Sequence, residues 1–380
     1  MHANSNSQIG VAGRRLPALI IGGGAIGLTL FGLIILSSVT QSSLGGSYYL
    51  VGKQALWFVA AAIAGMITYF IDLEELRSVT WVLAGALLVS LTIVLVPGIG
   101  VSVNGARRWL DLGLINLQVS DFSRIGLVFV LAHYLALNQR RMDSLRRGFL
   151  IPGGIIGITS LLILLEPDYG TAFIVAFVGF ILLFLGGARL VFLLPTILIG
   201  LFLFFAAIAA DPVRMRRVVT FFDIEGNRSD ATYQVWQAML AFAAGGLGGV
   251  GIGNGRQQRA FLPEAHTDFI FPIVGEELGF VCTSGVVIIF LVLFLTGIRQ
   301  LRKAPNLFYY ILACGALLMI SVQALLNFAV VTGCLPTKGL SLPFLSYGGS
   351  NLVATFILVG ILLNCFRRWS RIPPIKPMHL

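Results

Sequence analysis

Charged residues are scarce in this sequence. Only 11% of its 380 residues are Asp, Glu, Lys or Arg, and 57% are hydrophobic. A soluble globular domain carries about 25% charged residues. The apolar residues gather in runs of near-membrane length, and a bilayer core of roughly 30 Å takes about 20 apolar helical residues per crossing. The composition therefore excludes an ordinary soluble domain and predicts an all-α polytopic membrane protein.

Cysteine is also scarce, and its spacing excludes two classes of site. The four cysteines, Cys282, Cys314, Cys334 and Cys365, form no CxxC pair and lie in or beside apolar runs. Their spacing does not match the disulfide frameworks of small secreted domains, so we expect free thiols that pack between helices. No internal repeat is evident, although many transporters are built from repeats.

Acidic residues are fewer than basic ones, and the net charge is +10. The basic residues occur in short clusters between apolar runs instead of along one polar face, which argues against a nucleic-acid partner. In membrane proteins Lys and Arg accumulate in cytoplasmic loops. This rule places both termini in the cytoplasm, on the side of the clusters Arg14/Arg15, Arg140/Arg141/Arg146/Arg147, Arg299/Arg302/Lys303 and Arg367/Arg368/Arg371/Lys376.

The apolar runs predict about ten spans in one membrane domain, 17–367, between cytoplasmic tails at 1–16 and 368–380. The first run extends from Leu16 to Leu36, too long for an ordinary signal peptide, so an uncleaved first helix is expected. The predicted spans are 17–40, 54–71, 79–96, 121–137, 149–165, 171–186, 188–209, 270–297, 307–332 and 349–367.

Most of the unusual sequence falls in loops of the opposite, extracytoplasmic side. The loop 210–269 between the seventh and eighth spans is far longer than the 12–15 residues that ordinary connections reach. Its aromatic and apolar residues predict that it folds in part, with an amphipathic segment along the membrane surface. Three further loops share this side: 97–120, 166–170 (EPDYG) and 333–348.

Arginines in these loops form a candidate site for an anionic headgroup. The planar guanidinium donates two parallel hydrogen bonds to phosphate. The alternative is that each arginine extends to the interface and pairs with a nearby acid. The basic residues concerned are Arg107, Arg108, Arg124, Arg214, Arg216, Arg217, Arg256, Arg259 and Lys338.

The segment 262–280, LPEAHTDFIFPIVGEELGF, carries acids at the start of the eighth span. Asp268 could cap the helix, which stabilises it by about 1 kcal/mol, or could act on a substrate. Glu276 and Glu277 follow about 12–14 Å further along a continuous helix. Ionisable groups at such depth normally face a cavity or a partner.

Several motifs together resemble the SEDS family of shape, elongation, division and sporulation proteins, which comprises FtsW, RodA and SpoVE. The matching segments cover nearly the whole chain in the family's order, and LPTKG with PEAHTDFIFPIVGEELG is most like the FtsW division type. The segments are NGARRWL (104–110), EPDYGTA (166–172), YQ (233–234), GVGIGNGRQ (249–257), LPEAHTDFIF (262–271), GEELG (275–279) and LPTKGLSLPFLSYGGS (335–350).

The resemblance implies a peptidoglycan glycosyltransferase of the bacterial inner membrane that polymerises lipid II at the outer face. It implies a class B penicillin-binding protein as transpeptidase partner, beside other division or elongation membrane proteins and membrane lipid. Asp268 matches the family's essential aspartate and is expected to be catalytic. The residues expected to bind the lipid II headgroup or pyrophosphate are Arg108, Trp109, Arg124, Arg214, Lys338 and Glu276.

One motif departs from the family pattern. Where the family commonly has QPSE followed by a lysine, this chain has Gln118, Val119, Ser120 and Asp121, followed by Arg124. The charges are retained, whereas the missing proline puts the geometry of that loop in question.

The implied reaction is an inverting displacement in which a sugar hydroxyl attacks an anomeric carbon and undecaprenyl pyrophosphate leaves. A base within hydrogen-bond reach would accelerate it by about 10²–10⁴-fold, and Asp268 is the candidate. Positive charge for the leaving group would come from arginines or from a divalent cation such as Mg²⁺ or Mn²⁺. No organic cofactor is expected.

Two other functions stay open at this point. A lipid II flippase would need polar residues along a path through the bilayer, whereas the charged groups gather at one side. A scaffold that only recruits a synthase would not need those loop residues. The sequence does not separate a division polymerase from a RodA-type elongation polymerase.

Overall fold

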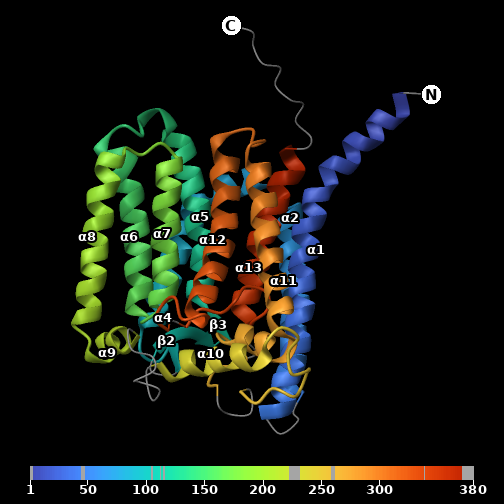
Figure 1. The fold of residues 1–380 in the computed structure, drawn as a ribbon. Coiled ribbons are helices and arrows are strands. Elements are labelled where there is room, and N and C mark those ends of the chain that lie inside the picture. Colours follow the sequence, from blue (N-terminus) through green and yellow to red (C-terminus); the bar gives the residue numbers. More distant parts are fainter. Residues whose placement is uncertain are drawn as a thin grey trace.

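The computed structural model describes residues 3–43, 48–103, 106–111, 113, 116–221, 232–257, 262–337 and 339–369. The chain forms a bundle of long, roughly parallel helices with a small sheet at one end (Figure 1). The helices and strands are α1 (Ala3–Ser43), α2 (Tyr49–Phe70), α3 (Leu73–Ser78), α4 (Thr80–Leu95), β1 (Gly100–Val103), β2 (Ala106–Asp111), β3 (Asn116–Gln118), α5 (Val119–Asn138), η1 (Gln139–Arg141), η2 (Leu145–Leu150), α6 (Ile151–Leu165), α7 (Tyr169–Leu185), α8 (Leu190–Ala209), α9 (Pro212–Phe221), α10 (Tyr233–Gly245), α11 (Ile270–Leu301), α12 (Leu307–Val331) and α13 (Gly349–Trp369).

The all-α membrane class is confirmed, and each of the ten predicted spans coincides with an apolar helix. Within the described residues, seven helices are long and apolar enough to cross a membrane. Three shorter apolar helices, Thr80–Leu95, Tyr169–Leu185 and Leu190–Leu203, coincide with the remaining predicted spans. Thr80–Leu95 has 16 residues and rises about 24 Å at 1.5 Å per residue, less than the hydrocarbon core. Ten complete crossings therefore stay a prediction.

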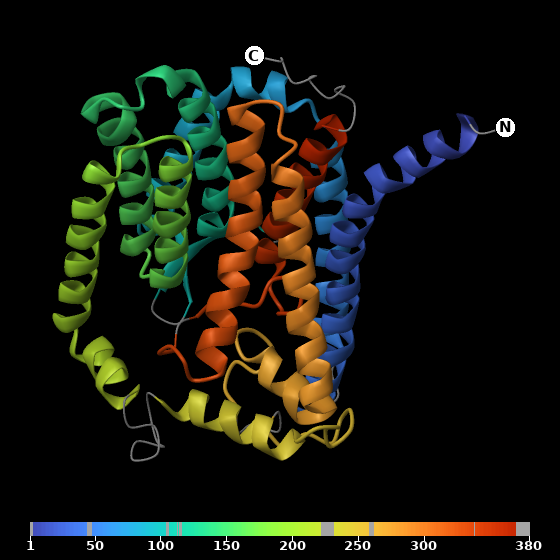
Figure 2. The ribbon, with the colours of Figure 1, turned by 45° about the horizontal axis from the view of Figure 1, so that its top comes forward.

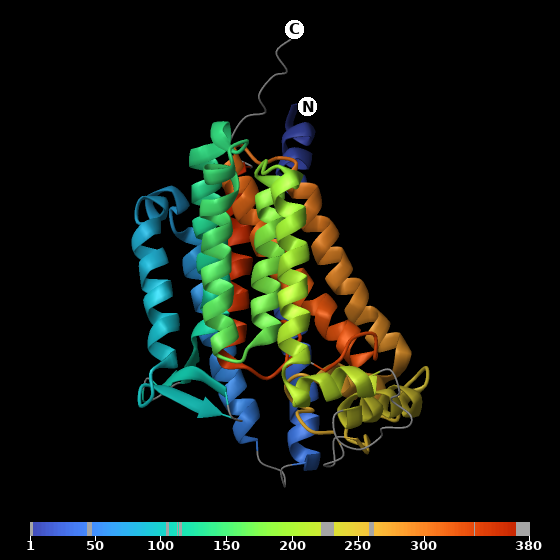
Figure 3. The same ribbon diagram turned by 90° about the vertical axis from the view of Figure 1, so that its left-hand side faces the viewer.

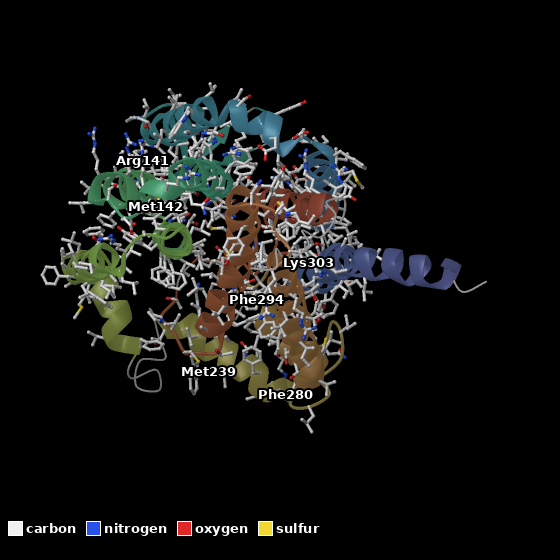
Figure 4. The ribbon with its side chains drawn as sticks, turned by 90° about the horizontal axis from the view of Figure 1, so that it is seen from above. Arg141, Met142, Met239, Phe280, Phe294 and Lys303 are labelled. Carbon is white, nitrogen blue, oxygen red and sulfur yellow. The ribbon has the colours of Figure 1, made fainter. Side chains whose placement is uncertain are left out.

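The two ends of the bundle differ in character. We call the end where α1 begins and α13 ends the terminal end, and the opposite end the loop end (Figure 1). The predicted cytoplasmic clusters that follow α5 and α11 lie at the terminal end, where Figure 4 looks down on Arg141 and Lys303. These two clusters thus lie at one end, as the sequence predicts, and the assignment of this end to the cytoplasm stays a prediction.

Helices α5, α12 and α13 are the most buried of the long helices, and α2 is the least. Close packing between α2 and α13 depends on glycine: a Cβ placed on Gly360 would lie 2.4 Å from the Gly65 carbonyl oxygen. Small residues allow such approach where lipid supplies no hydrophobic driving force between helices. Asn364 of α13 adds polar contacts by donating to the carbonyl oxygens of Thr68 (2.9 Å) and Ile71 (2.7 Å).

The loop end is more ordered than the sequence predicts. The segment 97–120, expected as a loop, contains the antiparallel sheet β1-β2-β3. Figure 3 shows this sheet below α4, at the same end as α10. The long segment 210–269 folds in part, as expected, into α9 and α10, which lead back from the outlying α8 beneath α12 (Figure 2).

Helix α11 is not continuous. Gly279 has φ 74° and ψ −173°, so Ile270–Leu278 and Phe280–Leu301 are separate helical segments. A residue with a Cβ rarely adopts this conformation. The predicted span 270–297 is therefore bent at Gly279, and Glu276 and Glu277 lie at the end of its first segment.

Candidate functional site

The turn 166–168 between α6 and α7 forms one wall of the site. Asp168 caps α7 by accepting a hydrogen bond from the Thr171 amide (3.1 Å). Its other carboxylate oxygen accepts bonds from Gln118 Nε2 and Ser120 Oγ, both at 3.3 Å. The turn is thereby fixed to the start of α5.

Arg108 of β2 reaches the same turn. Its Nε donates to the carbonyl oxygen of Glu166 (3.0 Å), and its Nη2 donates to that of Pro167 (2.6 Å). Arg108 is the extra residue at a shift in the β1–β2 register, where Val101 pairs with Trp109 and Ser102 with Arg107. The structure brings Arg108 into the site, whereas the contact predicted for Trp109 stays a prediction.

Asp268 lies in the loop that precedes α11. Its main-chain carbonyl oxygen accepts a hydrogen bond from Asn327 Nδ2 of α12 (2.8 Å). Its side chain is partly exposed, and within the described part of the chain no hydrogen bond is formed to the carboxylate. Carboxylate oxygen Oδ2 lies beside Gly339, since a Cβ placed there would be 3.3 Å away. The predicted catalytic carboxylate is thus available to a substrate.

The surroundings of Asp268 raise its pKa to about 7. Burial is the largest cause, and the negative charges of Glu264 and Asp168 add to it. Arg108 lowers the pKa of Asp268. Asp268, Asp168 and Arg108 therefore share one electrostatic environment, although they come from three separate segments.

Glu166 is a second acid with a strongly raised pKa, about 8, caused mainly by burial and then by Asp168, while Arg108 lowers it. Its side chain is fully buried, and neither carboxyl oxygen has a hydrogen-bond partner. At neutral pH this acid is mostly uncharged. The positive charge of Arg108 is consequently not neutralised by the side chain of Glu166.

Arg124 occupies a different environment from the one expected. Its guanidinium is 2% exposed and donates to Asp121 Oδ1 at 2.7 Å and to the side-chain oxygen of Gln323. Asn351 Nδ2 donates to the same Asp121 oxygen at 3.1 Å. This buried ion pair argues against the predicted direct contact with an anionic headgroup.

The segment without the family's proline keeps its helical start. Val119 is the first residue of α5, a position at which proline is tolerated because its N–H has no partner inside the helix. Gln118 before it has φ −86° and ψ 111°, close to the conformation of a residue that precedes proline. The backbone at this position is therefore compatible with the family's proline, although the chain has valine there.

Glu276 and Glu277 hold the glycine-rich segment 249–257. Glu276 is 1% exposed; its Oε1 accepts from the Arg256 amide (2.7 Å) and its Oε2 from the Gln257 amide (3.1 Å). Glu277 Oε1 accepts from the Gly253 amide (2.8 Å). The structure gives Glu276 a role in supporting this loop, in place of the predicted contact with substrate.

Two other predicted site residues cannot be compared in the same way. Lys338 and the side chain of Arg214 lie outside the described residues.

Strained backbone marks the same loops. Among the described residues, positive φ at positions other than glycine occurs at Pro167 (31°), Glu264 (57°) and Phe344 (71°). Such conformations cost about 1–3 kcal/mol each and cluster at active sites. All three lie in motif segments at the loop end.

The site predicted from sequence includes neither Glu166 nor Asp168, although both belong to the EPDYG motif. It does not include Asn327 either. A signal existed for Asn327: it and Gln323 are amides four residues apart within the apolar run 307–332. Polar residues inside a span commonly face a cavity or a partner.

Comparison with known proteins identifies the family of the chain. A family profile described as "Cell cycle protein", FTSW_RODA_SPOVE, matches residues 18–370. A protein of Trichlorobacter lovleyi named "Probable peptidoglycan glycosyltransferase FtsW" is 36% identical over 89% of this chain and 90% of its own length. The stage V sporulation protein E of Bacillus subtilis is 35% identical over 86% of this chain and 88% of its own length.

Solved structures show the same fold. A chain from a peptidoglycan synthase complex, described as coordinating polymerization and crosslinking, superposes with a TM-score of 0.77 and 25% identity over 93% of this chain and 98% of its own. The rod shape determining protein RodA of Thermus thermophilus superposes with a TM-score of 0.68 and 26% identity, covering 92% and 96%. The chain belongs to the FtsW/RodA/SpoVE family, the SEDS proteins.

Proposed function

We propose that the chain is a peptidoglycan glycosyltransferase that polymerises lipid II at the outer face of the bacterial inner membrane. One observation carries the proposal: the carboxylate of Asp268, partly exposed and accepting no hydrogen bond within the described residues, lies in the electrostatic environment of Arg108 at one end of a membrane bundle. Relatives at about 35% identity that are named probable peptidoglycan glycosyltransferases support the same activity.

In the proposed reaction, Asp268 takes the proton of the C4 hydroxyl of one lipid-linked disaccharide. The hydroxyl oxygen forms a bond to the anomeric carbon of a second molecule as the bond from that carbon to the pyrophosphate oxygen breaks. The electron pair leaves with undecaprenyl pyrophosphate. A single displacement of this kind inverts the anomeric configuration, with no covalent intermediate on the protein.

The environment of Asp268 suits a base of this kind. A catalytic base works best when its pKa lies near the operating pH, and the pKa of Asp268 is about 7. Arg108 is the cation that we propose for the leaving pyrophosphate, because it shares the electrostatic environment of Asp268 and the side chain of Glu166 is mostly uncharged at neutral pH. Lys338 and Arg214 stay proposed ligands of the headgroup, as does Trp109.

A divalent cation is a further proposal for charge compensation. Mg²⁺ commonly uses one or two carboxylates together with substrate phosphates and water. Within the described residues no group of three or more His, Cys, Asp or Glu side chains is arranged to hold a metal ion. An all-protein cage therefore does not fit, and we assign no step of the reaction to a cation.

We further propose a role in cell division beside a class B penicillin-binding protein. Relatives named FtsW support the division role, and the similarity to a chain of a peptidoglycan synthase complex supports a transpeptidase partner.

Asp268→Asn tests the base directly, because the amide keeps the size of the side chain and cannot accept the proton. With lipid II and the transpeptidase partner, we expect the rate of glycan polymerisation to fall by at least about 10²-fold. Asp143→Asn, the same change on an exposed carboxylate near the terminal end, should leave the rate unchanged. Full activity of Asp268→Asn would refute the assignment.

A further inference from the structure

A polar face on α12 connects this helix to the loops of the site. Gln323 and Asn327 are four residues apart, so they lie on the same side of the helix. Both are buried, at 2% and 1% exposure. Gln323 Nε2 donates to the carbonyl oxygen of Ser341 at 2.8 Å. Asn327 makes two bonds of this type, and they join two loops.

The two bonds of Asn327 come from one side-chain nitrogen. Nδ2 donates to the main-chain carbonyl oxygen of Asp268 (2.8 Å) and to that of Leu340 (2.7 Å). Asp268 lies in the loop before α11, and Leu340 in the loop between α12 and α13. The amide oxygen Oδ1 is buried and has no hydrogen-bond partner among the described residues. The side chain therefore acts in this fold only as a donor.

The position of Gly339 shows which part of the site the two hydrogen bonds of Asn327 hold in place. Leu340 follows Gly339, and a Cβ at Gly339 would lie 3.3 Å from Asp268 Oδ2. The second bond of Asn327 thus fixes the backbone directly beside the carboxylate, while the first fixes the backbone that carries it. Both loops are held to one rigid helix by one amide group.

We propose that Asn327 is a positioning residue that sets the place of the Asp268 carboxylate by holding the two loops at a fixed separation. The inference rests on the proposed function of Asp268 as a base. Misplacement of reacting groups by about 1 Å can reduce a rate by about 10²-fold. Loss of the donor should therefore reduce turnover far more than it reduces substrate binding.

The chain contains a matched control for this contact. Asn364 of α13 is also buried and also uses Nδ2 to donate to two main-chain carbonyl oxygens, those of Thr68 and Ile71. It lies near the terminal end, away from Asp268. Asn327→Asp and Asn364→Asp remove the same pair of donors with little change in size, and each places carboxylate oxygens beside carbonyl oxygens.

The experiment measures kcat and KM for glycan polymerisation from lipid II by the full chain with its transpeptidase partner, together with thermal unfolding in detergent. We expect Asn327→Asp to lower kcat at least about tenfold with less than about a twofold change in KM. Asn364→Asp should show a similar shift in unfolding temperature with little change in kcat. Equal losses of kcat in both variants would overturn the proposal, because they would indicate a structural role alone.

Gly339→Ala provides a second variant if Asn327→Asp fails to fold. Gly339 is exposed and its φ is not positive, so alanine fits the backbone, and its methyl group would press on the Asp268 carboxylate. We expect a lower kcat with unchanged unfolding temperature; unchanged kcat would contradict the importance of this spacing. An inactive wild type would instead refute the proposed function, which separates the two failures.

Discussion

Asp268 can act as a base only if its neighbouring residues give its carboxylate a suitable pKa. Burial and the charges of Glu264 and Asp168 raise the pKa of Asp268 to about 7, against the effect of Arg108. A base must be deprotonated to act, so activity should fall as the pH drops below about 7. A free aspartate, with a pKa near 3.9, would stay active to much lower pH.

Glu264→Gln tests this dependence on charge. The substitution removes a negative charge that raises the pKa of Asp268, so the acid limb of the pH–rate profile should move to lower pH. The shift should be less than about one pH unit, because Glu264 is exposed and acts through a high dielectric. Glu75→Gln, the same change on an exposed side chain of α3, is the control. A shift to higher pH would contradict the account.

Sequence predicts single residues best where one segment carries the information. The HTDFIF motif predicts Asp268 as the catalytic residue; its side chain is partly exposed, and its role stays a prediction. Arg124 was assigned to phosphate because basic loop residues were grouped by side of the membrane. The spacing of Asp121 and Arg124, three residues apart at a helix start, indicates a pair on one helical face. Partners distant in sequence, such as Gln323, could not be read from the motif.

At the scale of elements, the break in α11 decides how the acids of the GEELG motif are used. Ile270–Leu278 turns away from the axis of the long segment, and Phe280 and Val281 donate main-chain bonds to Gly246 (2.9 Å) and Leu247 (3.3 Å). The glycine-rich loop packs into this bend. The hydropathy of the sequence predicts a single span because both segments are apolar. Hydropathy carries no information on the backbone direction at Gly279.

Gly279→Ala should therefore disrupt the loop end. A Cβ at this position would lie 2.4 Å from the Gly249 nitrogen and from the Leu247 carbonyl oxygen, and the positive φ adds strain. We expect a loss of at least about 1–3 kcal/mol in stability. Gly285→Ala on the same helix meets no atom within 4 Å and should be neutral or slightly stabilising.

Thermal unfolding in detergent compares these two variants with wild type. A lower unfolding temperature for Gly279→Ala alone is the predicted result. Equal unfolding temperatures for both variants would show that the break is not required by the fold.

At the scale of the whole molecule, composition and charge predicted most of the architecture. Ten apolar runs correspond to ten apolar helices, and the basic clusters gather at the terminal end. The sequence does not predict the sheet β1-β2-β3, because its strands are short and rich in polar residues. Its pairing with the turn at 166–168 depends on contacts between segments more than 50 residues apart, such as Arg108 with Glu166.

The location of the proposed reactive groups at one end of the bundle favours a polymerase over a flippase. A flippase must pass the headgroup from one end of the bundle to the other. Asp268 and Arg108, to which we assign roles in the reaction, both lie at the loop end, as does Asp168. Their position favours a reaction completed on one side of the membrane.

The most direct test of this account is polymerisation in vesicles that contain the chain and its transpeptidase partner in one orientation, with lipid II supplied to a single leaflet. We predict that glycan strands form only when lipid II is on the side of the loop end, and that Asp268→Asn abolishes them there. Strands formed equally from lipid II on the terminal side, or transfer of lipid II across the membrane without polymerisation, would contradict it.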